Sequence, residues 1–217
     1  DWLTPQVYRA AMDFVRENAA GPKPFFLTID HFDPHEPWDP PQHYTDLYDP
    51  DYTGRAKQGT HDRYGQANWL TPRELKHMRA LYAGEVTLVD TWLGKFLDTL
   101  EELGLMKKTL IVFLSDHGHT LGEHNLTGKI PWAMYPELVD IPALYYDPEL
   151  PGGAKVDGLI YNLDLITTVM NRLGVTSQVH LDGIDLRLMI AGGHGGRPYV
   201  TCAFKDFVYV RRGRQAL

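Results

Sequence analysis

A short apolar run that ends in a polar tetrapeptide constrains the fold of this chain most strongly. Residues 109–114 read Thr-Leu-Ile-Val-Phe-Leu and lead directly into Ser115-Asp116-His117-Gly118. A nearly continuous apolar run of this length predicts a buried strand, and strands that alternate with helices predict an α/β fold. Open α/β sheets bind ligands just past the carboxyl ends of their strands. The tetrapeptide therefore stands where a functional site is expected.

Other segments carry the patterns of regular secondary structure. An amphipathic helix is expected over residues 4–18, with Thr4 as its cap and Pro5 in its first turn. A longer helix, residues 71–103, begins with Thr71-Pro72-Arg73-Glu74, which has the spacing of a capping box. The remaining expectations are buried strands at 25–29 and 141–146, a helix at 162–173 ended by Gly174, and a hairpin of 199–203 with 207–210.

Composition narrows the class of protein. A hydrophobic fraction of 43% supports a packed core, and a net charge of -7 argues against nucleic acid as a partner. No apolar run reaches the length of a membrane span. The single cysteine, Cys202, excludes an internal disulfide and is expected to be a small buried strand residue. With no visible signal peptide either, the cellular location stays open.

The residues after the strand have the chemistry of a metal and anion site. Asp116 and His117 offer a carboxylate oxygen and an imidazole nitrogen to a divalent cation, and Gly118 permits a sharp turn beside them. The polar, glycine-rich segment that follows ends in Lys129, whose ammonium can hold an anionic oxygen. The alternative is structural, with Asp116 capping the next turn and both His117 and Lys129 exposed.

A second polar cluster follows the run expected to be a strand at residues 25–29. It reads Asp30-His31-Phe32-Asp33-Pro34-His35-Glu36-Pro37-Trp38. The two prolines stiffen the backbone around His35, and a fixed histidine can donate a proton to a leaving oxygen. A second metal site made of His31, His35 and Asp33 is a weaker alternative.

Together these motifs resemble those of the sulfatase family in the alkaline-phosphatase superfamily. Residues 33–38 resemble its histidine motif, and Ser115 to Lys129 resemble its second metal and substrate motif. Residues 135–144, 162–174 and 181–186 resemble further family segments in the same order. The resemblance implies an α/β/α sandwich with a mixed central sheet, incomplete at its N-terminus, followed by a small β-hairpin. It also implies a catalytic part over 1–195 and the start of a C-terminal antiparallel β subdomain over 196–217.

The resemblance also implies roles for particular residues. Asp116 and His117 would bind one divalent cation, while Lys129 and His35 would contact the substrate, with His35 assisting the leaving group. Calcium is the favoured ion, and the imidazole also admits manganese or zinc. Many family members carry Asn where this chain has His117, and an Asp-His pair is similar to members that act on choline sulfate or phosphonate monoesters. A small-molecule or saccharide sulfate ester is the expected partner.

One family motif is absent from the 217 residues. The family's nucleophile is a formylglycine made within Cys/Ser-x-Pro-x-Arg, and neither form of this motif occurs here. Cys202 is followed by Ala203-Phe204-Lys205 and cannot replace it. We therefore expect this chain to be a fragment that is inactive alone. Its partner would be the N-terminal half of the same domain, which would supply the formylglycine and the remaining metal ligands.

Four functions are considered for a chain with these motifs. Hydrolysis of sulfate monoesters leads, and hydrolysis of phosphonate monoesters or phosphodiesters is the alternative within the superfamily. A phosphoglycerate mutase also carries an Asp-His-Gly motif, but residues 33–38 argue against it. A non-catalytic domain that retains the fold is the fourth. Residues 40–69 are expected to shape the pocket, with surface packing favoured over a place in its wall for Trp38, His43, Tyr44 and Trp69.

Overall fold

The computed structural model describes residues 2–193 and 195–216. The described chain divides into two compact units. The first is drawn from residues 1–109 and 119–130, and the second from 110–118 and 131–217. The domain boundary expected at residue 195 is not tested by this division and stays a prediction.

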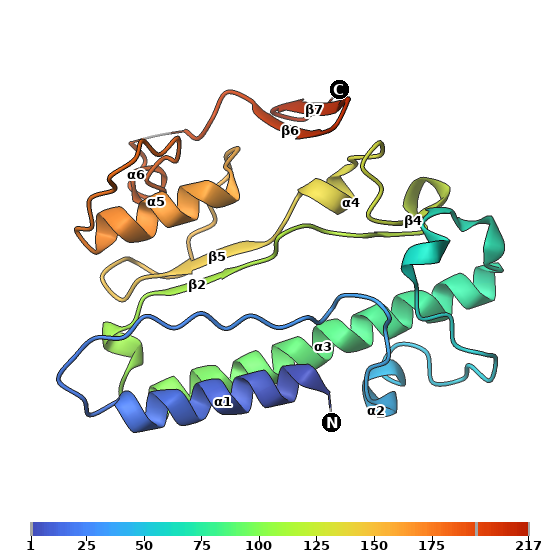
Figure 1. Ribbon diagram of the computed structural model, residues 1–217, viewed down its shortest axis with the longest axis horizontal. Coiled ribbons are helices and arrows are strands. Elements are labelled where there is room, and N and C mark those ends of the chain that lie inside the picture. Colours follow the sequence, from blue (N-terminus) through green and yellow to red (C-terminus); the bar gives the residue numbers. More distant parts are fainter. Residues whose placement is uncertain (1, 194, 217) are drawn as a thin grey trace. The chain divides into compact units, whose positions relative to one another are not determined.

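In the first unit, helix α1 (Leu3–Asn18) packs against the long helix α3 (Pro72–Glu102), as Figure 1 shows. The apolar stripe of α1 is buried, with Val15 fully inaccessible and the Tyr8 ring 6.2 Å from that of Phe96. Thr4 does not cap α1, contrary to expectation, because the helix begins at Leu3 and Thr4 is buried inside its first turn. Trp2 takes the N-cap position.

Helix α3 begins as its sequence predicts. The Thr71 hydroxyl accepts a hydrogen bond from the Glu74 amide at 3.2 Å, and the Glu74 carboxylate accepts one from the Thr71 amide at 2.8 Å. Further along the helix, Arg73 and His77 both contact the carboxylate of buried Asp49. The hydrogen bond from Arg73 lowers the pKa of Asp49 to about 2, against the opposing effect of burial. These contacts fasten the irregular segment before α3 to the helix.

The strand expected at residues 25–29 does not form. These residues are assigned to no strand, and Phe26 is 80% exposed. A strand requires hydrogen-bonding neighbours, and no paired strand is recorded for this segment in the described parts of the chain. The apolar composition of residues 25–29 is therefore not sufficient to make them a strand.

The rest of the first unit consists of short elements that position the site. Strand β4 (Leu126–Gly128) pairs antiparallel with β1 (Gly65–Gln66) and with β3 (Thr120–Leu121). Beneath this sheet, Trp38 is fully buried and packs with two residues of α3, so it belongs to the core and not to the surface. The short helical elements are α2 (Gln42–Thr45), η1 (His61–Arg63), η2 (Ala67–Trp69), η3 (Met106–Lys108) and η4 (Glu123–Asn125).

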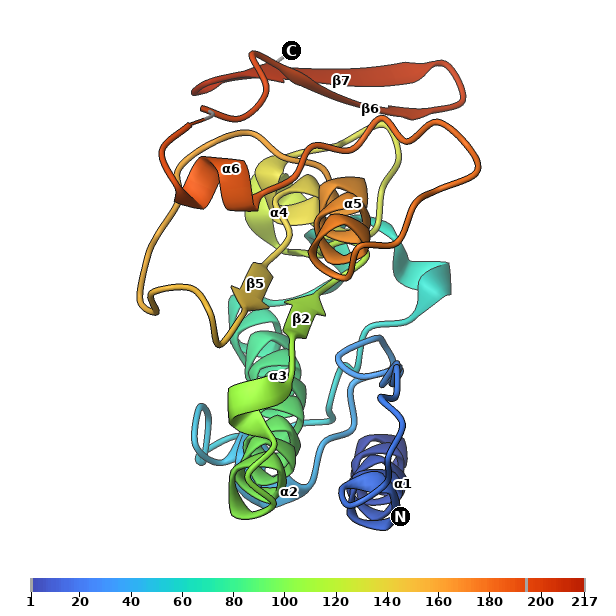
Figure 2. The same cartoon turned by 90° about the vertical axis from the view of Figure 1, so that its left-hand side faces the viewer.

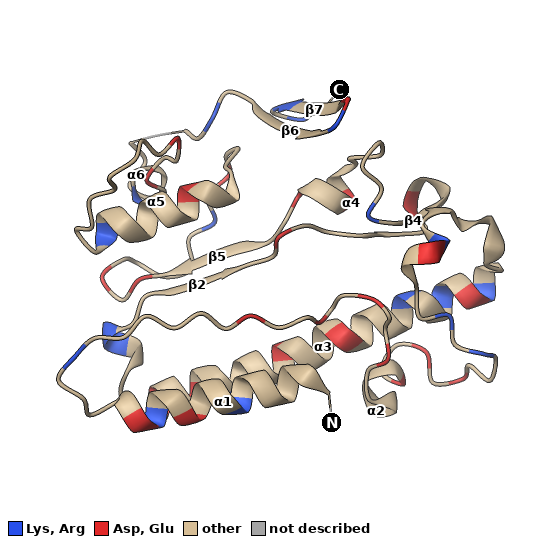
Figure 3. Ribbon diagram, viewed as in Figure 1, with Lys and Arg blue, Asp and Glu red and all other residues tan. Residues whose placement is uncertain are grey.

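In the second unit, strands β2 (Ile111–Leu114) and β5 (Ala143–Tyr146) form an antiparallel pair with Val112 opposite Tyr145. Neither strand contains a charged residue, and the charges lie beyond their ends (Figure 3). Both strands are confirmed close to the expected positions. The core of this unit is made of Leu165, Leu186 and Met189, against which Val112 and Tyr145 pack.

Helix α5 (Asn162–Arg172) holds the most connected carboxylate of the second unit. Asp164 is fully buried and accepts hydrogen bonds from the Tyr161 amide at 2.7 Å and the Ile184 amide at 2.8 Å. The Arg197 guanidinium is 2.5 Å from the same carboxylate. One turn later, the Thr168 hydroxyl accepts from the Leu186 amide at 2.8 Å. Helix α5 and the loop over residues 182–186 therefore fold as one structure.

Beyond helices α4 (Pro136–Val139) and α6 (Arg187–Ile190), the second unit ends in an antiparallel sheet of β6 (Val200–Phe204), β7 (Phe207–Arg212) and β8 (Gln215–Ala216), seen in Figure 2. The hairpin is confirmed, with Phe204 opposite Phe207. Cys202 is exposed, contrary to expectation, because β6 shows solvent most of its side chains. Within the described residues, no helix is both long and apolar enough to cross a bilayer.

Candidate anion-binding and metal-binding residues

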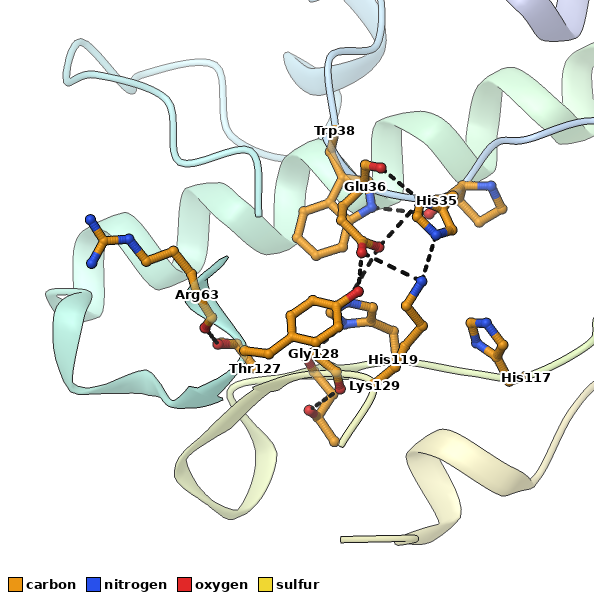
Figure 4. A network of polar contacts seen from close by, with 12 residues as sticks. His35, Glu36, Trp38, Arg63, His117, His119, Thr127, Gly128 and Lys129 are labelled. Atoms are coloured by element: carbon orange, nitrogen blue, oxygen red, sulfur yellow. Dashed lines mark hydrogen bonds and ion pairs between the residues drawn. The ribbon is translucent and has the colours of Figure 1, made fainter. Parts of the chain in front are cut away.

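The first unit brings together two of the predicted site residues, His35 and Lys129. Their side chains meet at 2.5 Å between Nε2 and Nζ, although the residues are 94 positions apart (Figure 4). His35 Nδ1 donates to the carbonyl oxygen of Glu36 at 2.7 Å. Because that oxygen only accepts, Nδ1 carries the ring proton and Nε2 accepts from the Lys129 ammonium. The two side chains are therefore in contact, while their roles toward a substrate stay predictions.

The buried carboxylate of Glu36 is the centre of this network. Its side chain is 5% exposed, and its Oε1 lies 3.4 Å from Lys129 Nζ and accepts a hydrogen bond from the Tyr64 hydroxyl. Burial raises the pKa of Glu36, but the hydrogen bond from Tyr64 and the charge of Lys129 outweigh it, so that the pKa lies below its ordinary value. Glu36 is therefore an ionised partner of Lys129 at neutral pH.

Aromatic residues enclose the network on the far side of the carboxylate. His119 Nε2 lies 3.7 Å from Glu36 Oε2, and the His119 ring is packed edge-to-face against Trp38 at 5.0 Å and Tyr64 at 5.9 Å. Burial and the bond to Glu36 raise the pKa of Tyr64, so its hydroxyl stays protonated and keeps donating. The network thus has one side closed by aromatic rings.

Local contacts fix the loop that carries His35. The Trp38 indole donates to the Pro34 carbonyl at 3.0 Å, and the Asp39 amide donates to Glu85 Oε1 on α3 at 3.0 Å. The peptide bonds before Pro34 and Pro37 are both cis. Glu85 is 1% exposed, and burial together with the charge of Asp33 raises its pKa to about 7. The loop is therefore tied at both ends of the 34–39 segment.

An ammonium group has three N–H donors. In the described structure His35 and Glu36 account for two of those of Lys129, which leaves one for an anionic oxygen. The Lys129 side chain is 20% exposed. Figure 4 shows its Nζ between His35 and Glu36. The residues can therefore orient an anion and place the His35 imidazole beside it.

The second unit carries the predicted metal ligands at the end of β2. His117 Nδ1 donates to the Gly118 carbonyl at 2.8 Å, which directs the lone pair to Nε2. Nε2 lies 3.5 Å from Asp116 Oδ2. Metal–ligand distances of about 2.0 to 2.5 Å place two ligand atoms of one ion at about this separation. The pair thus fits two positions of a divalent cation, and the Asp116 carboxylate is open to solvent.

Further ligands for that cation are not gathered in the described part of the chain. No cluster of three or more His, Cys, Asp or Glu side chains suited to a metal ion occurs there. The weaker prediction of a second metal site from His31, His35 and Asp33 is therefore not supported. The His31 ring is instead held by the Asp33 carbonyl at 2.7 Å and the Tyr8 hydroxyl at 3.4 Å.

Comparison with known proteins decides the family. The family model described as "Sulfatase" matches residues 3–175. The chain belongs to the sulfatase family. An arylsulfatase of Clostridium perfringens (strain 13 / Type A) is 30% identical over 203 residues, which cover 86% of this chain and 41% of that protein. The 217 residues of this sulfatase-family chain thus match less than half the length of that relative.

Solved structures share the fold. The phosphonate monoester hydrolase of Agrobacterium radiobacter matches with a TM-score of 0.75 at 23% identity, over 98% of this chain and 53% of that one. A protein solved in complex with its substrate D-glucosamine-2-N,6-O-disulfate matches with a TM-score of 0.74 at 19% identity, over 97% and 59%. At such identities the likeness concerns the fold alone. It confirms the alkaline-phosphatase-like α/β fold expected from the sequence.

Sequence reasoning did not find three residues of the network. Glu36 stands inside the histidine motif, and a charged residue between His35 and Pro37 is a signal that could have been used. His119 directly follows Gly118, so its place in the motif was also visible. Tyr64 lies in the irregular segment 28 residues after its partner, and no local pattern marks it.

Proposed function

We propose that the protein containing this chain hydrolyses sulfate monoesters with the help of one divalent cation. The observation that carries the proposal is the contact between Lys129 and His35 over the buried Glu36 carboxylate, in a chain of the sulfatase family. Lys129 holds an anionic oxygen of the ester group, and His35 stands beside it to assist the leaving oxygen. Both roles depend on the ionised state of Glu36.

Asp116 and His117 supply two ligands of the cation in this proposal. When bound, the cation provides Lewis-acid polarisation of the ester group. The fixed tautomer of His117 and the open carboxylate of Asp116 support the assignment. Calcium is the favoured ion, with manganese or zinc as alternatives, and the formylglycine nucleophile is proposed to lie outside these 217 residues.

The substrate class follows from the same reasoning. We propose a small-molecule or saccharide sulfate ester, since one structural neighbour was solved with a sulfated glucosamine as its substrate. The second candidate function is hydrolysis of phosphonate monoesters. Its support is the Asp-His pair together with the fold likeness to the Agrobacterium radiobacter phosphonate monoester hydrolase.

Hydrolysis of 4-nitrophenyl sulfate and 4-nitrophenyl phenylphosphonate tests the proposal in the protein expressed from its complete reading frame. Lys129→Ala should lower kcat/KM by about a hundredfold or more, as the loss of one preorganised donor does elsewhere. The matched control is Lys155→Ala, whose side chain is 89% exposed and whose kcat/KM should stay unchanged. Equal rates for the two variants would refute the role of Lys129, and no hydrolysis of either ester by the wild type would refute the proposed function.

Metal binding has a separate readout. Calorimetric titration with Ca²⁺ or Mn²⁺ should show one site in the wild type, and Asp116→Ala should weaken it by at least about tenfold. Asp157→Ala is the control, since its side chain is 90% exposed. A wild type that binds no divalent cation would favour a non-catalytic domain that retains the fold.

A further inference from the structure

The charge of the network, and not only its geometry, bears on which esters the site accepts. Among the described residues, Lys129 is the one cation of this network, and the Glu36 carboxylate lies 3.4 Å from it with only 5% of the Glu36 side chain exposed. His35 Nδ1 is engaged with a carbonyl oxygen and its Nε2 with the ammonium, which fits a neutral ring. Lys129, Glu36 and His35 together therefore carry no net charge.

We propose that Glu36 makes this site selective for esters with a single negative charge over esters with two. The inference rests on the proposed function, because it concerns the anion that Lys129 would hold. A sulfate monoester, a phosphonate monoester and a phosphodiester each carry one negative charge. A phosphate monoester carries two near pH 8. The proposed divalent cation attracts both classes of ester, and Glu36 adds to this the repulsion of the second charge by its buried carboxylate.

The environment of Glu36 preserves its charge. Two partners stabilise the charge of the carboxylate: the Tyr64 hydroxyl, which donates a hydrogen bond to it, and the Lys129 ammonium. Burial opposes ionisation, but these partners hold the pKa of Glu36 below its ordinary value. Glu36 thus keeps its charge while little water is present to screen it.

The size of the effect follows from Coulomb's law. A unit charge several ångströms from a second anionic charge, at an effective dielectric between those of a protein surface and of water, changes binding by about tenfold. Glu36→Gln removes the charge and keeps the shape and an acceptor oxygen for Tyr64. The variant should therefore raise the ratio of kcat/KM for the dianion over the monoanion by about tenfold.

Three esters with the same 4-nitrophenyl leaving group test this in the protein expressed from its complete reading frame at pH 8. They are the sulfate and the phenylphosphonate, with one negative charge each, and the phosphate with two. The wild type should use the phenylphosphonate at least about tenfold better than the phosphate. Because both contain phosphorus, this comparison separates charge from the identity of the central atom.

Two variants serve as controls. Tyr64→Phe removes a hydrogen bond from Glu36 but keeps its charge, so the dianion-to-monoanion ratio should stay within about twofold of the wild type. Glu149→Gln removes a carboxylate that is 75% exposed and should change nothing. A Glu36→Gln enzyme that loses activity on all three esters in equal proportion would overturn the proposal, since that is the signature of a purely structural role.

The wild-type measurement stands even where Glu36→Gln fails to fold. A wild type that prefers the phosphate over the phenylphosphonate would overturn the charge selectivity directly. A wild type that hydrolyses none of the three esters would refute the proposed function instead. The two failures are therefore distinguishable.

Discussion

Replacing Asp164 by Asn should destabilise the second unit strongly. The carboxylate is fully buried and accepts from the amides of Tyr161 and Ile184 and from the Arg197 guanidinium. The Asn side chain has one acceptor oxygen, so its NH₂ group must face one of these donors. It also leaves the Arg197 charge without its partner. The first defect arises at a side chain that is fully buried.

The magnitude follows from these contacts. Breaking one partner of a buried ion pair costs about 3 to 5 kcal/mol. Arg197 is 19% exposed and can be partly rehydrated, which favours the lower end, about 3 kcal/mol. Hydrogen exchange of the α5 amides reports this local opening, and 3 kcal/mol corresponds to about a hundredfold faster exchange.

The matched control is Asp157→Asn, because the Asp157 side chain is 90% exposed and its ion pair with Lys155 is long, at 3.9 Å. This variant should leave exchange in α5 within about twofold of the wild type. If the Asp164 and Asp157 variants exchanged at the same rate, the central role of the Asp164 carboxylate would be wrong.

Two buried carboxylates and one tightly packed glycine give three further predictions. The hydrogen bond from Arg73 lowers the pKa of Asp49 to about 2, so the stability that the ionised Asp49 contributes is complete above about pH 4 and is lost as the pH falls toward 2. Because the Arg73 guanidinium is half-exposed, Asp49→Asn should lower the free energy of unfolding by only about 1 to 2 kcal/mol at pH 7 and by little at pH 2. Urea unfolding at each pH measures both values. Burial raises the pKa of Glu85 to about 7, so the stability of the wild type should fall by about 3 kcal/mol as the pH rises from about 4.5 through 7. Glu85→Gln should remove this loss, and parallel curves of stability against pH for the two proteins would contradict it. A Cβ on Gly183 would clash with the Thr167 hydroxyl, so Gly183→Ala should lower Tm by several degrees, whereas Gly152→Ala, with open space around it, should not.

The sequence correctly predicted those features that depend only on residues close together in the chain. The capping box of Thr71 and Glu74 and the positive φ of Gly174 depend on residues a few positions apart, and both are present. The strand at 25–29 failed because strand formation depends on a distant partner, which a run of apolar residues does not specify. The prediction of Thr4 as a cap was wrong because the helix begins one residue earlier and the Thr4 side chain is buried.

The candidate site also contains residues that local motifs indicated and residues that only the folded structure brings together. His35 and Lys129 were singled out because both stand in motifs with recognisable spacing, and the structure adds that their side chains are in contact. Their roles toward a substrate stay predictions. Glu36 and Tyr64 were missed because their importance arises from a contact between distant segments. The roles of Asp116 and His117 stay predictions, since two ligand atoms at a fitting distance are compatible with an ion but do not bind one alone.

The path of the chain through the two units has a consequence for how such a protein can change. The backbone passes from one unit to the other at residues 109/110, 118/119 and 130/131. Lys129 and Asp116 are close in sequence but belong to different units. No single cut in the chain releases either unit whole, and no single recombination event replaces one while sparing the other. The proposed anion-binding residue and the proposed metal ligand therefore cannot be exchanged separately by swapping one whole unit in a single recombination event.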